Sequence, residues 1–281
     1  MYTLNCKGRM LIIDKPIVMG IINVTPDSFY SGSRKETGAG IVAKATIMLR
    51  DGATIIDIGG QSTRPGSTLL SANEEADRVI PAIEAVMKEH PSAILSIDTF
   101  HSSVARDSVH AGAALVNDIS AGNMDGGMIA TVASLQVPYI VMHMKGNPQT
   151  MQQEATYEQV TTEVLDFMIA KKEACIRAGI KDLVIDPGFG FGKTIQHNLV
   201  LLQQLKAFKM LNLPLLAGLS RKSTVYKTLG TSAEEALNGT TVLNTIALMN
   251  GANILRVHDV KEAVECIKLI NAFQAVKAGV S

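Results

Sequence analysis

Eight short runs rich in Val, Ile and Leu recur along the chain, and they constrain its fold more than any other feature. Each run is continuously apolar and does not alternate with polar residues. This pattern is typical of strands that are buried on both faces of a parallel sheet. The runs span Ile17–Val24, Thr54–Ile58, Ile94–Ile97, Ala114–Val116, Tyr139–Met142, Leu183–Ile185, Leu213–Leu219 and Ile254–Val257.

Amphipathic helical patterns lie between these runs. Ser71 and Glu74 form a capping box at the start of one pattern, and Gly179 is suited to end another. Glu75 falls in the first turn of the capped helix, where the helix dipole favours an acidic side chain. The patterns span Ser71–Glu89, Tyr157–Ala178, His197–Leu211, Ala233–Asn250 and Val260–Val276. Strands that alternate with helices predict a parallel α/β fold.

Eight strand–helix units in 281 residues predict a (β/α)₈ TIM barrel, whose typical length is about 250 residues. The alternative is an open, doubly wound sheet. No Pro-, Gly- or Ser-rich linker divides the chain, so we expect residues 1–281 to form a single domain. The first 15 residues precede the first strong strand, and we expect a short hairpin there that closes the bottom of the barrel.

Charge and composition narrow the classes of function. Lys plus Arg and Asp plus Glu are both 26, and this balance argues against a nucleic-acid partner and a polybasic membrane anchor. Hydrophobic residues reach 47%, which provides a core and leaves apolar surface for an oligomer interface. No signal peptide and no apolar stretch of about 18 residues is evident, so no membrane span is expected. Three widely spaced cysteines without a CxxC pair fit a reducing cytoplasm.

Polar residues stand at or just beyond the C-terminal end of every expected strand. They are Asn23, Asp57, Asp98, Asn117 with Asp118, His143, Asp186, Arg221 with Lys222, and Arg256 with His258. A parallel barrel brings all eight strand ends to one face, which is where barrel enzymes have their active sites. Unpaired charges on a partly buried surface are costly, so these groups should pair with one another or with a ligand.

The chemistry of these side chains suggests what they bind. Asp98 and Asp186 suit an amino or guanidine-like edge. Arg64, Lys222, Arg256 and His258 can hold an anion, and the carboxamide of Asn23 can complete the shell of a Mg²⁺ ion that also holds phosphate oxygens. Two residues have structural alternatives: Asp57 as the partner of a neighbouring cation, and His143 as a hydrogen-bonded core histidine.

The segment Pro187–Thr194, PGFGFGKT, is close to a phosphate-binding P-loop but does not match it. Pro187 stands where that motif requires glycine, and Lys193 stands where a dinucleotide-binding motif requires its last glycine. The glycines still indicate a tight turn or a backbone that approaches a ligand closely.

Eight longer motifs appear in order along the chain. They are NVTPDSF at 23–29, GGQSTRPG at 59–66, SIDT at 96–99, NDIS at 117–120, MHMKGNPQTMQ at 142–152, DPGFGFGK at 186–193, SRKS at 220–223 and RVHDV at 256–260. In these motifs the chain resembles the dihydropteroate synthase family over essentially its whole length. The resemblance implies a (β/α)₈ barrel, usually a homodimer, that joins 6-hydroxymethyl-7,8-dihydropterin pyrophosphate to 4-aminobenzoate. The products are 7,8-dihydropteroate and pyrophosphate, made in folate biosynthesis, and sulfonamides compete with 4-aminobenzoate in this family.

The resemblance also assigns residues to subsites. The expected pterin site contains Asp98, Asn117, Ile119, Met142, Asp186, Phe191, Lys222 and Arg256. The expected 4-aminobenzoate site contains Phe29, Thr63, Arg64, Pro65 and Ser223. Asn23, Arg256 and His258 are expected around the pyrophosphate, with Mg²⁺ bound through Asn23 and the leaving group.

Side-chain chemistry agrees with the pterin assignment. Asp186 can accept two hydrogen bonds from the amino and N3–H edge of the pterin, and Asn117 can both donate and accept. The planar guanidinium of Arg256 can stack on the ring while it reaches phosphate, and Lys222 can donate to the pterin carbonyl.

No nucleophile-and-base arrangement is evident, and an arylamine is neutral at pH 7. We therefore expect a dissociative reaction in which pyrophosphate leaves before the amine attacks. Asp98, Lys222, Arg256 and His258 are the expected catalytic residues, with Asp98 stabilising the pterin cation and the basic groups stabilising the departing anion.

Two alternatives in function remain from the sequence. A pterin-binding module of the corrinoid methyltransferases shares the barrel, but it does not need the STRPG loop or the SRKS anion site. A divergent synthase that discriminates against sulfonamide is the other alternative. One departure from the family pattern is Ser31, which stands where many members have Asp.

Overall fold

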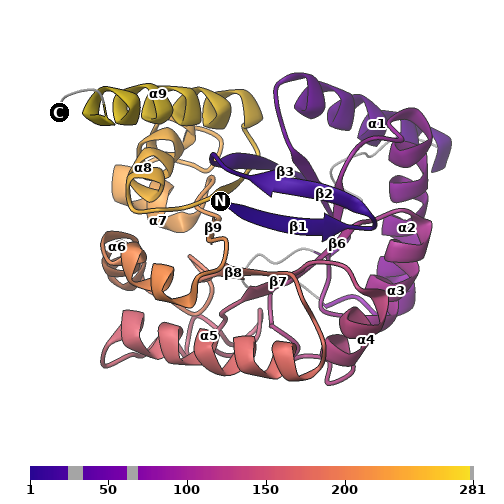
Figure 1. Ribbon diagram of the computed structural model, residues 1–281, viewed down its shortest axis with the longest axis horizontal. Coiled ribbons are helices and arrows are strands. Elements are labelled where there is room, and N and C mark those ends of the chain that lie inside the picture. The colour runs from indigo at the N-terminus through magenta and orange to yellow at the C-terminus, as the bar shows by residue number, and fades with distance from the viewer. Residues whose placement is uncertain (25–33, 62–68, 279–281) are drawn as a thin grey trace.

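Eight parallel strands close into a barrel with the helices outside it (Figure 1). The computed structural model describes residues 1–24, 34–61 and 69–278. The strands run in the order β8-β7-β6-β5-β4-β3-β10-β9, and a parallel bridge between Ile185 and Leu215 joins the two ends of this order. The predicted (β/α)₈ barrel is therefore confirmed, and the open doubly wound sheet is excluded.

The observed strands match the continuous apolar runs to within one residue at nearly every end. They are β3 (Ile17–Asn23), β4 (Ile55–Gly59), β5 (Leu95–Asp98), β6 (Leu115–Asp118), β7 (Tyr139–Met142), β8 (Leu183–Asp186), β9 (Leu216–Ala217) and β10 (Ile254–Val257). The exceptions are β6, which ends two residues beyond the run Ala114–Val116, and β9, which is much shorter than the run Leu213–Leu219. Pro214 has no backbone N–H to give to a strand ladder, which limits pairing at the start of this run.

The helices depart more from the predicted ranges. They are α1 (Arg34–Arg50), α2 (Ala72–Glu89), α3 (Ser102–Ala111), α4 (Met128–Leu135), α5 (Val160–Arg177), α6 (Ile195–Gln203), α7 (Ser223–Leu229), α8 (Leu237–Met249) and α9 (Val260–Ala278). The range His197–Leu211 was wrong as one helix, because a separate 3₁₀ segment, Leu205–Leu211, follows α6. Of the helices that the structure describes, none is both long enough and apolar enough to cross a membrane.

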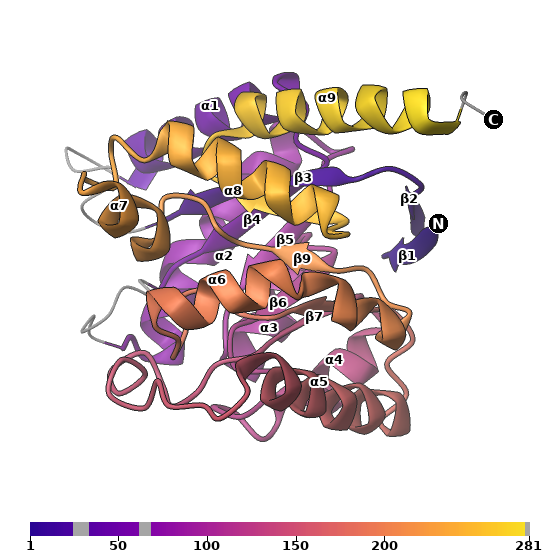
Figure 2. The ribbon, with the colours of Figure 1, turned by 90° about the vertical axis from the view of Figure 1, so that its left-hand side faces the viewer.

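The N-terminal hairpin is present as predicted. Strands β1 (Tyr2–Cys6) and β2 (Arg9–Ile13) pair antiparallel, and they lie across one end of the barrel, away from α7 (Figure 2). Leu4, Cys6, Leu11 and Ile13 are buried and pack against the barrel interior. The hairpin therefore closes the N-terminal end of the barrel and leaves the other end for a ligand.

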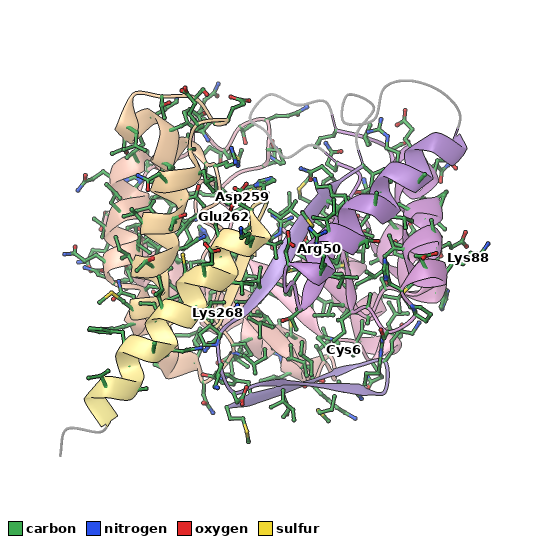
Figure 3. The ribbon with its side chains drawn as sticks, turned by 90° about the horizontal axis from the view of Figure 1, so that it is seen from above. Cys6, Arg50, Lys88, Asp259, Glu262 and Lys268 are labelled. Carbon is green, nitrogen blue, oxygen red and sulfur yellow. The ribbon has the colours of Figure 1, made fainter. Side chains whose placement is uncertain are left out.

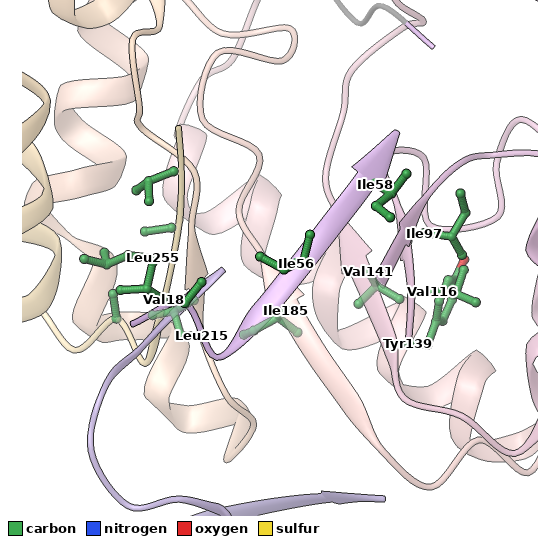
Figure 4. Close-up of a cluster of buried hydrophobic side chains, with 14 of the residues drawn as sticks. Val18, Ile56, Ile58, Ile97, Val116, Tyr139, Val141, Ile185, Leu215 and Leu255 are labelled. Carbon is green, nitrogen blue, oxygen red and sulfur yellow. The ribbon is translucent and has the colours of Figure 1, made fainter. Parts of the chain in front are cut away.

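Two faces of each strand serve different parts of the core, because successive side chains point to opposite sides. The outward side chains pack beneath the helices; Val18, Ile56, Val116, Val141, Ile185 and Leu255 are among those in Figure 4. The inward side chains nearest the hairpin form a second apolar cluster: Met19, Ile55, Leu115, Ile140, Val184, Leu216 and Ile254. The inward positions two residues further along are Ile21, Asp57, Asn117, Met142, Asp186, Gly218 and Arg256. The interior thus changes from apolar to largely polar toward the C-terminal end of the barrel.

Candidate active site

The change to polar residues creates a candidate active site at the C-terminal end of the barrel. Asp259, just beyond β10, lies at this end, whereas Cys6 lies in the hairpin at the opposite end (Figure 3). Parallel strands in register bring side chains that are distant in sequence together here. Gly59 is paired with Asp98, and Asp98 with Asn117.

A buried charge network crosses the barrel mouth. The guanidinium of Arg256 donates from Nε to Oδ2 of Asp57 at 2.7 Å and from Nη2 to Oδ2 of Asp98 at 2.5 Å. Nδ2 of Asn117 donates to the same oxygen of Asp57 at 3.0 Å. The interpretation of Asp57 as the partner of a strand-end cation is therefore confirmed. The network holds the planar guanidinium of Arg256 in one orientation.

The carboxyl group of Asp98 has a raised pKa within this network. Burial raises the pKa of Asp98 to about 7, and the nearby Arg256 opposes that rise. The buried neighbours Asp57 and Asp118 raise the pKa further, because like charges disfavour ionisation. A carboxyl group that titrates near neutral pH in a cleft is a common sign of a functional site.

Asp186 and Lys222 both lie close to Gly218. Oδ1 of the buried Asp186 accepts a hydrogen bond from the Gly188 N–H at 2.7 Å. A Cβ atom added to Gly218 would lie 3.7 Å from Nζ of Lys222 and 3.9 Å from Oδ2 of Asp186. A side chain at Gly218 would therefore lie against both charged groups.

The ammonium group of Lys222 is held by the PGFGFG loop. It donates to the carbonyl of Phe189 and lies 4.6 Å from the ring centroid of Phe191. Burial lowers the pKa of Lys222 to about 8, while the carboxylate of Asp186 opposes that change. Lys222 thus remains a hydrogen-bond donor at neutral pH.

His258 and Arg221 lie beside this pocket in different roles. Oγ of Ser220 is 3.0 Å from Nδ1 of His258, and burial lowers the pKa of His258 to about 4. The ring of His258 is therefore neutral at neutral pH. The guanidinium of Arg221 makes two 2.8 Å hydrogen bonds to Asp259 and also donates to the carbonyl of Ala233, so its contacts are structural.

An apolar cluster forms one wall. The predicted wall residues Ile119, Met142 and Phe191 are all buried in it. The cluster also contains Phe100, Met144 and Met151, which were not predicted to line the site. Phe100 directly follows SIDT, and the two methionines lie within MHMKGNPQTMQ, so their places in these motifs could have indicated them.

The structure describes only part of the expected 4-aminobenzoate site. Ser223 is at the start of α7, directly after the N-cap Lys222. Phe29, Ser31, Thr63, Arg64 and Pro65 lie outside the described residues. Asn23 ends β3 with an exposed side chain. Within the described ranges, no group of three or more His, Cys, Asp or Glu residues is placed to hold a metal ion.

Two interpretations from the sequence are resolved at buried positions. His143 is buried, with Nδ1 at 2.9 Å from Nζ of Lys193 and its ring edge-on to Phe167, which supports the core-histidine interpretation. Glu75 lies in the first turn of α2, as predicted, but its side chain points into the core. It is fully buried, and its Oε2 accepts a hydrogen bond from the Thr99 hydroxyl at 2.7 Å.

Glu75 provides a test of stability against pH. Burial raises the pKa of Glu75 from 4.5 to about 7, so the folded state retains a proton that the unfolded state loses above pH 4.5. Stability from this group is therefore present below pH 4.5 and decreases as the pH rises toward 7. Glu75→Gln removes the titration and keeps an acceptor for Thr99. We expect its free energy of unfolding to exceed that of the parent by up to about 3 kcal/mol at pH 8, and by much less at pH 5.

Urea denaturation at both pH values measures this difference. Glu74→Gln is the matched control on the same helix turn, because Glu74 is an exposed cap residue. An equal effect of Glu75→Gln at pH 5 and pH 8 would show that the buried carboxyl group does not titrate in this range.

Comparisons with known proteins identify the family of the chain. A family model described as "Pterin binding enzyme" matches residues 19–258. Dihydropteroate synthase from Escherichia coli (strain K12) is 44% identical over 273 residues, which cover 96% of each chain.

Solved structures of related enzymes have the same fold over nearly their whole length. Xanthomonas albilineans dihydropteroate synthase with 4-aminobenzoic acid has a TM-score of 0.90 and 41% identity, covering 97% of this chain and 98% of that chain. The complex of the enzyme from that organism with 7,8-dihydropteroate has a TM-score of 0.88 and 39% identity, covering 98% and 99%. Yersinia pestis dihydropteroate synthase in a sulfonamide drug complex has a TM-score of 0.90 and 42% identity, covering 98% and 100%. The chain belongs to the dihydropteroate synthase family of pterin-binding enzymes.

Proposed function

We propose that the pocket around Asp186, Lys222 and Arg256 is the place where this dihydropteroate synthase joins its substrates. The reaction converts 6-hydroxymethyl-7,8-dihydropterin pyrophosphate and 4-aminobenzoate to 7,8-dihydropteroate and pyrophosphate, in folate biosynthesis. The observation that carries the assignment is that the buried Asp186 and the amine of Lys222 lie beside the same side-chain-free residue, Gly218.

The pterin ring is recognised along its polar edges. Asp186 accepts from the amino and N3–H donors, and Lys222 donates to the carbonyl. Asn117 serves the other ring edge. Ile119, Met142 and Phe191 contact the apolar surface of the ring, which is shielded from water.

The pyrophosphate lies toward Asn23, Arg256 and His258. When bound, Mg²⁺ neutralises charge on the leaving group. The described residues offer no cluster of His, Cys, Asp or Glu for the ion, so the carboxamide of Asn23 would suit a Mg²⁺ that keeps waters and phosphate oxygens as its other ligands.

The bond-breaking step separates charge across the pocket. The electron pair of the C–O bond leaves with pyrophosphate, where Arg256 and His258 donate hydrogen bonds. Asp98, 2.5 Å from Arg256, offers negative charge to the pterin cation. The neutral amine of 4-aminobenzoate then forms the C–N bond, and its proton is lost to water or pyrophosphate. No covalent intermediate with the enzyme is involved.

The proposed 4-aminobenzoate site contains Phe29, Thr63, Arg64, Pro65 and Ser223. It is supported by the position of Ser223 beside Lys222 and by the 4-aminobenzoic acid and sulfonamide complexes of relatives. We also propose that sulfonamides compete for this site.

A coupled assay with pterin pyrophosphate and labelled 4-aminobenzoate tests the function directly. Labelled dihydropteroate is the expected product. A pterin-binding module without synthase activity would bind the pterin and release no pyrophosphate. Tight binding of 4-aminobenzoate to the enzyme in the absence of pyrophosphate would contradict the order in which pyrophosphate leaves first.

The Mg²⁺ assignment gives a separate prediction. Asn23→Ala is expected to raise the Mg²⁺ concentration that gives half-maximal turnover, by about tenfold, because one oxygen ligand is lost. Affinity for the pterin ring without pyrophosphate should not change. A Mg²⁺ titration of turnover at saturating substrates measures the effect. An unaltered titration would remove Asn23 from the metal site.

A homodimer is proposed through the outer faces of α8 and α9. These helices pack together and expose large apolar side chains, among them Val242, Met249 and Leu269, the last of which is 72% exposed. Exposed apolar groups that are concentrated on one face favour association with a second copy.

Leu269→Glu is expected to shift the protein from dimer to monomer, because it would place a charge in the interface. Sedimentation velocity across a range of protein concentrations measures the change. Ile12→Glu is the matched control, since Ile12 is an exposed apolar residue on the hairpin. If Leu269→Glu remained dimeric, the interface would lie elsewhere.

A cytoplasmic location is proposed from the cysteines. All three are free and buried, as suits a compartment that keeps thiols reduced.

A further inference from the structure

Lys193 is a buried lysine outside the substrate pocket. Its side chain is 3% exposed, and its ammonium group has a full set of acceptors. Nζ donates to the carbonyl of Gly188 at 2.9 Å and to the carbonyl of Phe191 at 3.1 Å. Nδ1 of His143 is 2.9 Å away. The carbonyl oxygen of His143 is a fourth acceptor, at 3.4 Å. With four acceptors around Nζ, Lys193 is committed to contacts inside the protein.

The ring of His143 is suited to accept a hydrogen bond from Lys193. Burial lowers the pKa of His143 to about 2, and its ring packs edge-on against Phe167 with centroids 4.8 Å apart. The ring is therefore neutral, and one of its nitrogens can accept a hydrogen bond. Lys193 thus joins the end of β7 to the loop that follows β8.

The loop that follows β8 is rich in glycines with unusual backbone angles. Gly188 adopts φ +72°, and an added Cβ there would lie 1.8 Å from the carbonyl oxygen of His143. Gly190 and Gly192 also have positive φ. A backbone of this kind is intrinsically flexible, so its shape depends on the contacts that surround it. The contacts from Lys193 reach it at Gly188 and Phe191, on both sides of Phe189.

The same short segment holds both charged groups of the proposed pterin site. The N–H of Gly188 donates to Oδ1 of Asp186, and the carbonyl of Phe189 accepts from Lys222. The ring of Phe191 lies beneath the Lys222 ammonium. Lys193 therefore holds the segment whose Gly188 N–H and Phe189 carbonyl make the hydrogen bonds to Asp186 and Lys222.

We propose that Lys193 is a positioning residue for pterin binding, which clamps residues 188–191 so that Asp186 and Lys222 stay at the spacing required by the pterin edge. This inference rests on the proposed pterin site. Lys193 does not contact the substrate. Its loss should therefore act on the pterin and leave the 4-aminobenzoate site largely unaffected.

Lys193→Met tests the clamp, because Met has a similar length and no donors. We expect KM for the pterin pyrophosphate to rise by about tenfold or more, since small displacements of binding groups are costly. KM for 4-aminobenzoate, measured at saturating pterin, should change by less than about twofold. Lys193→Gln restores two N–H donors and should recover part of the pterin affinity, which a loss of packing alone would not explain. It also serves as the second variant if Lys193→Met does not fold.

Lys172→Met is the matched control. Nζ of Lys172 donates to the carbonyl of Leu211 at 2.8 Å, so this variant removes a lysine–carbonyl bond far from the proposed pterin loop. It should change neither KM. Thermal unfolding of each variant separates lost stability from lost positioning.

Asp186→Asn distinguishes a failure of the positioning role of Lys193 from a failure of the proposed pterin site. If Asp186→Asn weakens pterin binding and folded Lys193→Met does not, Lys193 has no positioning role, and the proposed pterin site is still supported. Equal increases in both KM values for Lys193→Met would also overturn the clamp, because they indicate a general structural loss. If Asp186→Asn has no effect on pterin affinity, the proposed site itself is wrong.

Discussion

Asp186→Asn is expected to weaken binding of the pterin substrate by about 2–5 kcal/mol while the barrel remains folded. This is the cost that is typical of truncating one partner of a buried, charged hydrogen bond. It corresponds to an increase in Kd of roughly 30-fold to several thousandfold.

The geometry around Asp186 explains the size of this effect. One carboxylate oxygen already accepts from the Gly188 N–H, and the other lies near Gly218 and Lys222. The amide of Asn must place its NH₂ group either against the Gly188 N–H or against the donors of the pterin, and two donors repel each other in both arrangements. Asn also removes the negative charge that faces Lys222 and Arg256.

Titration calorimetry with the pterin pyrophosphate measures the change, and thermal unfolding confirms that the variant is folded. Asp182→Asn is the matched control, because Asp182 lies just before the other end of the same strand and accepts from the backbone N–H of Asn5. It should leave pterin affinity unchanged. Unchanged affinity in Asp186→Asn would remove this residue from the site.

The strands were predictable because a buried parallel strand needs a continuous apolar run, which leaves a strong signal in a few residues. The helices were harder. Helices α1, α3, α4 and α7 were not predicted, and α8 begins at Leu237, four residues after the predicted start. A helix on the outside of a barrel needs only a narrow apolar stripe, so the limits of its pattern are indistinct.

The strand ends that form the site were predictable, but the pairing of the side chains at those ends was not. The period of two along each strand brings Asp57, Asn117 and Arg256 into the same interior, yet it does not specify which groups pair. Lys193 and Glu75 show a second limit. Both are charged residues in glycine-rich or helical segments that resemble surface segments, and only the packing of neighbouring elements buries them.

Arg256→Met is expected to abolish turnover and to destabilise the protein by about 3–5 kcal/mol, the typical cost of leaving a buried charge without its partner. Asp57 is fully buried and Asp98 nearly so, and Arg256 is hydrogen-bonded to both. Met preserves much of the volume of the side chain but compensates neither carboxylate.

The loss of stability should depend on pH in a defined direction. Arg256 holds down the pKa of Asp98, so its removal moves that pKa further above the value of about 4 in the unfolded chain. The folded variant then binds a proton that the unfolded chain releases, and its stability decreases as the pH rises through neutrality. Urea denaturation at pH 6 and pH 8 should therefore show a larger deficit at pH 8.

A second substitution distinguishes the structural role of Arg256 from its role toward the substrate. Arg256→Met combined with Asp57→Asn removes one uncompensated carboxylate, and the Asn side chain can still accept from Nδ2 of Asn117. The double variant should regain part of the lost stability and none of the turnover, because no cation then faces the departing pyrophosphate. Recovery of turnover together with stability would mean that Arg256 acts only by holding the barrel mouth together.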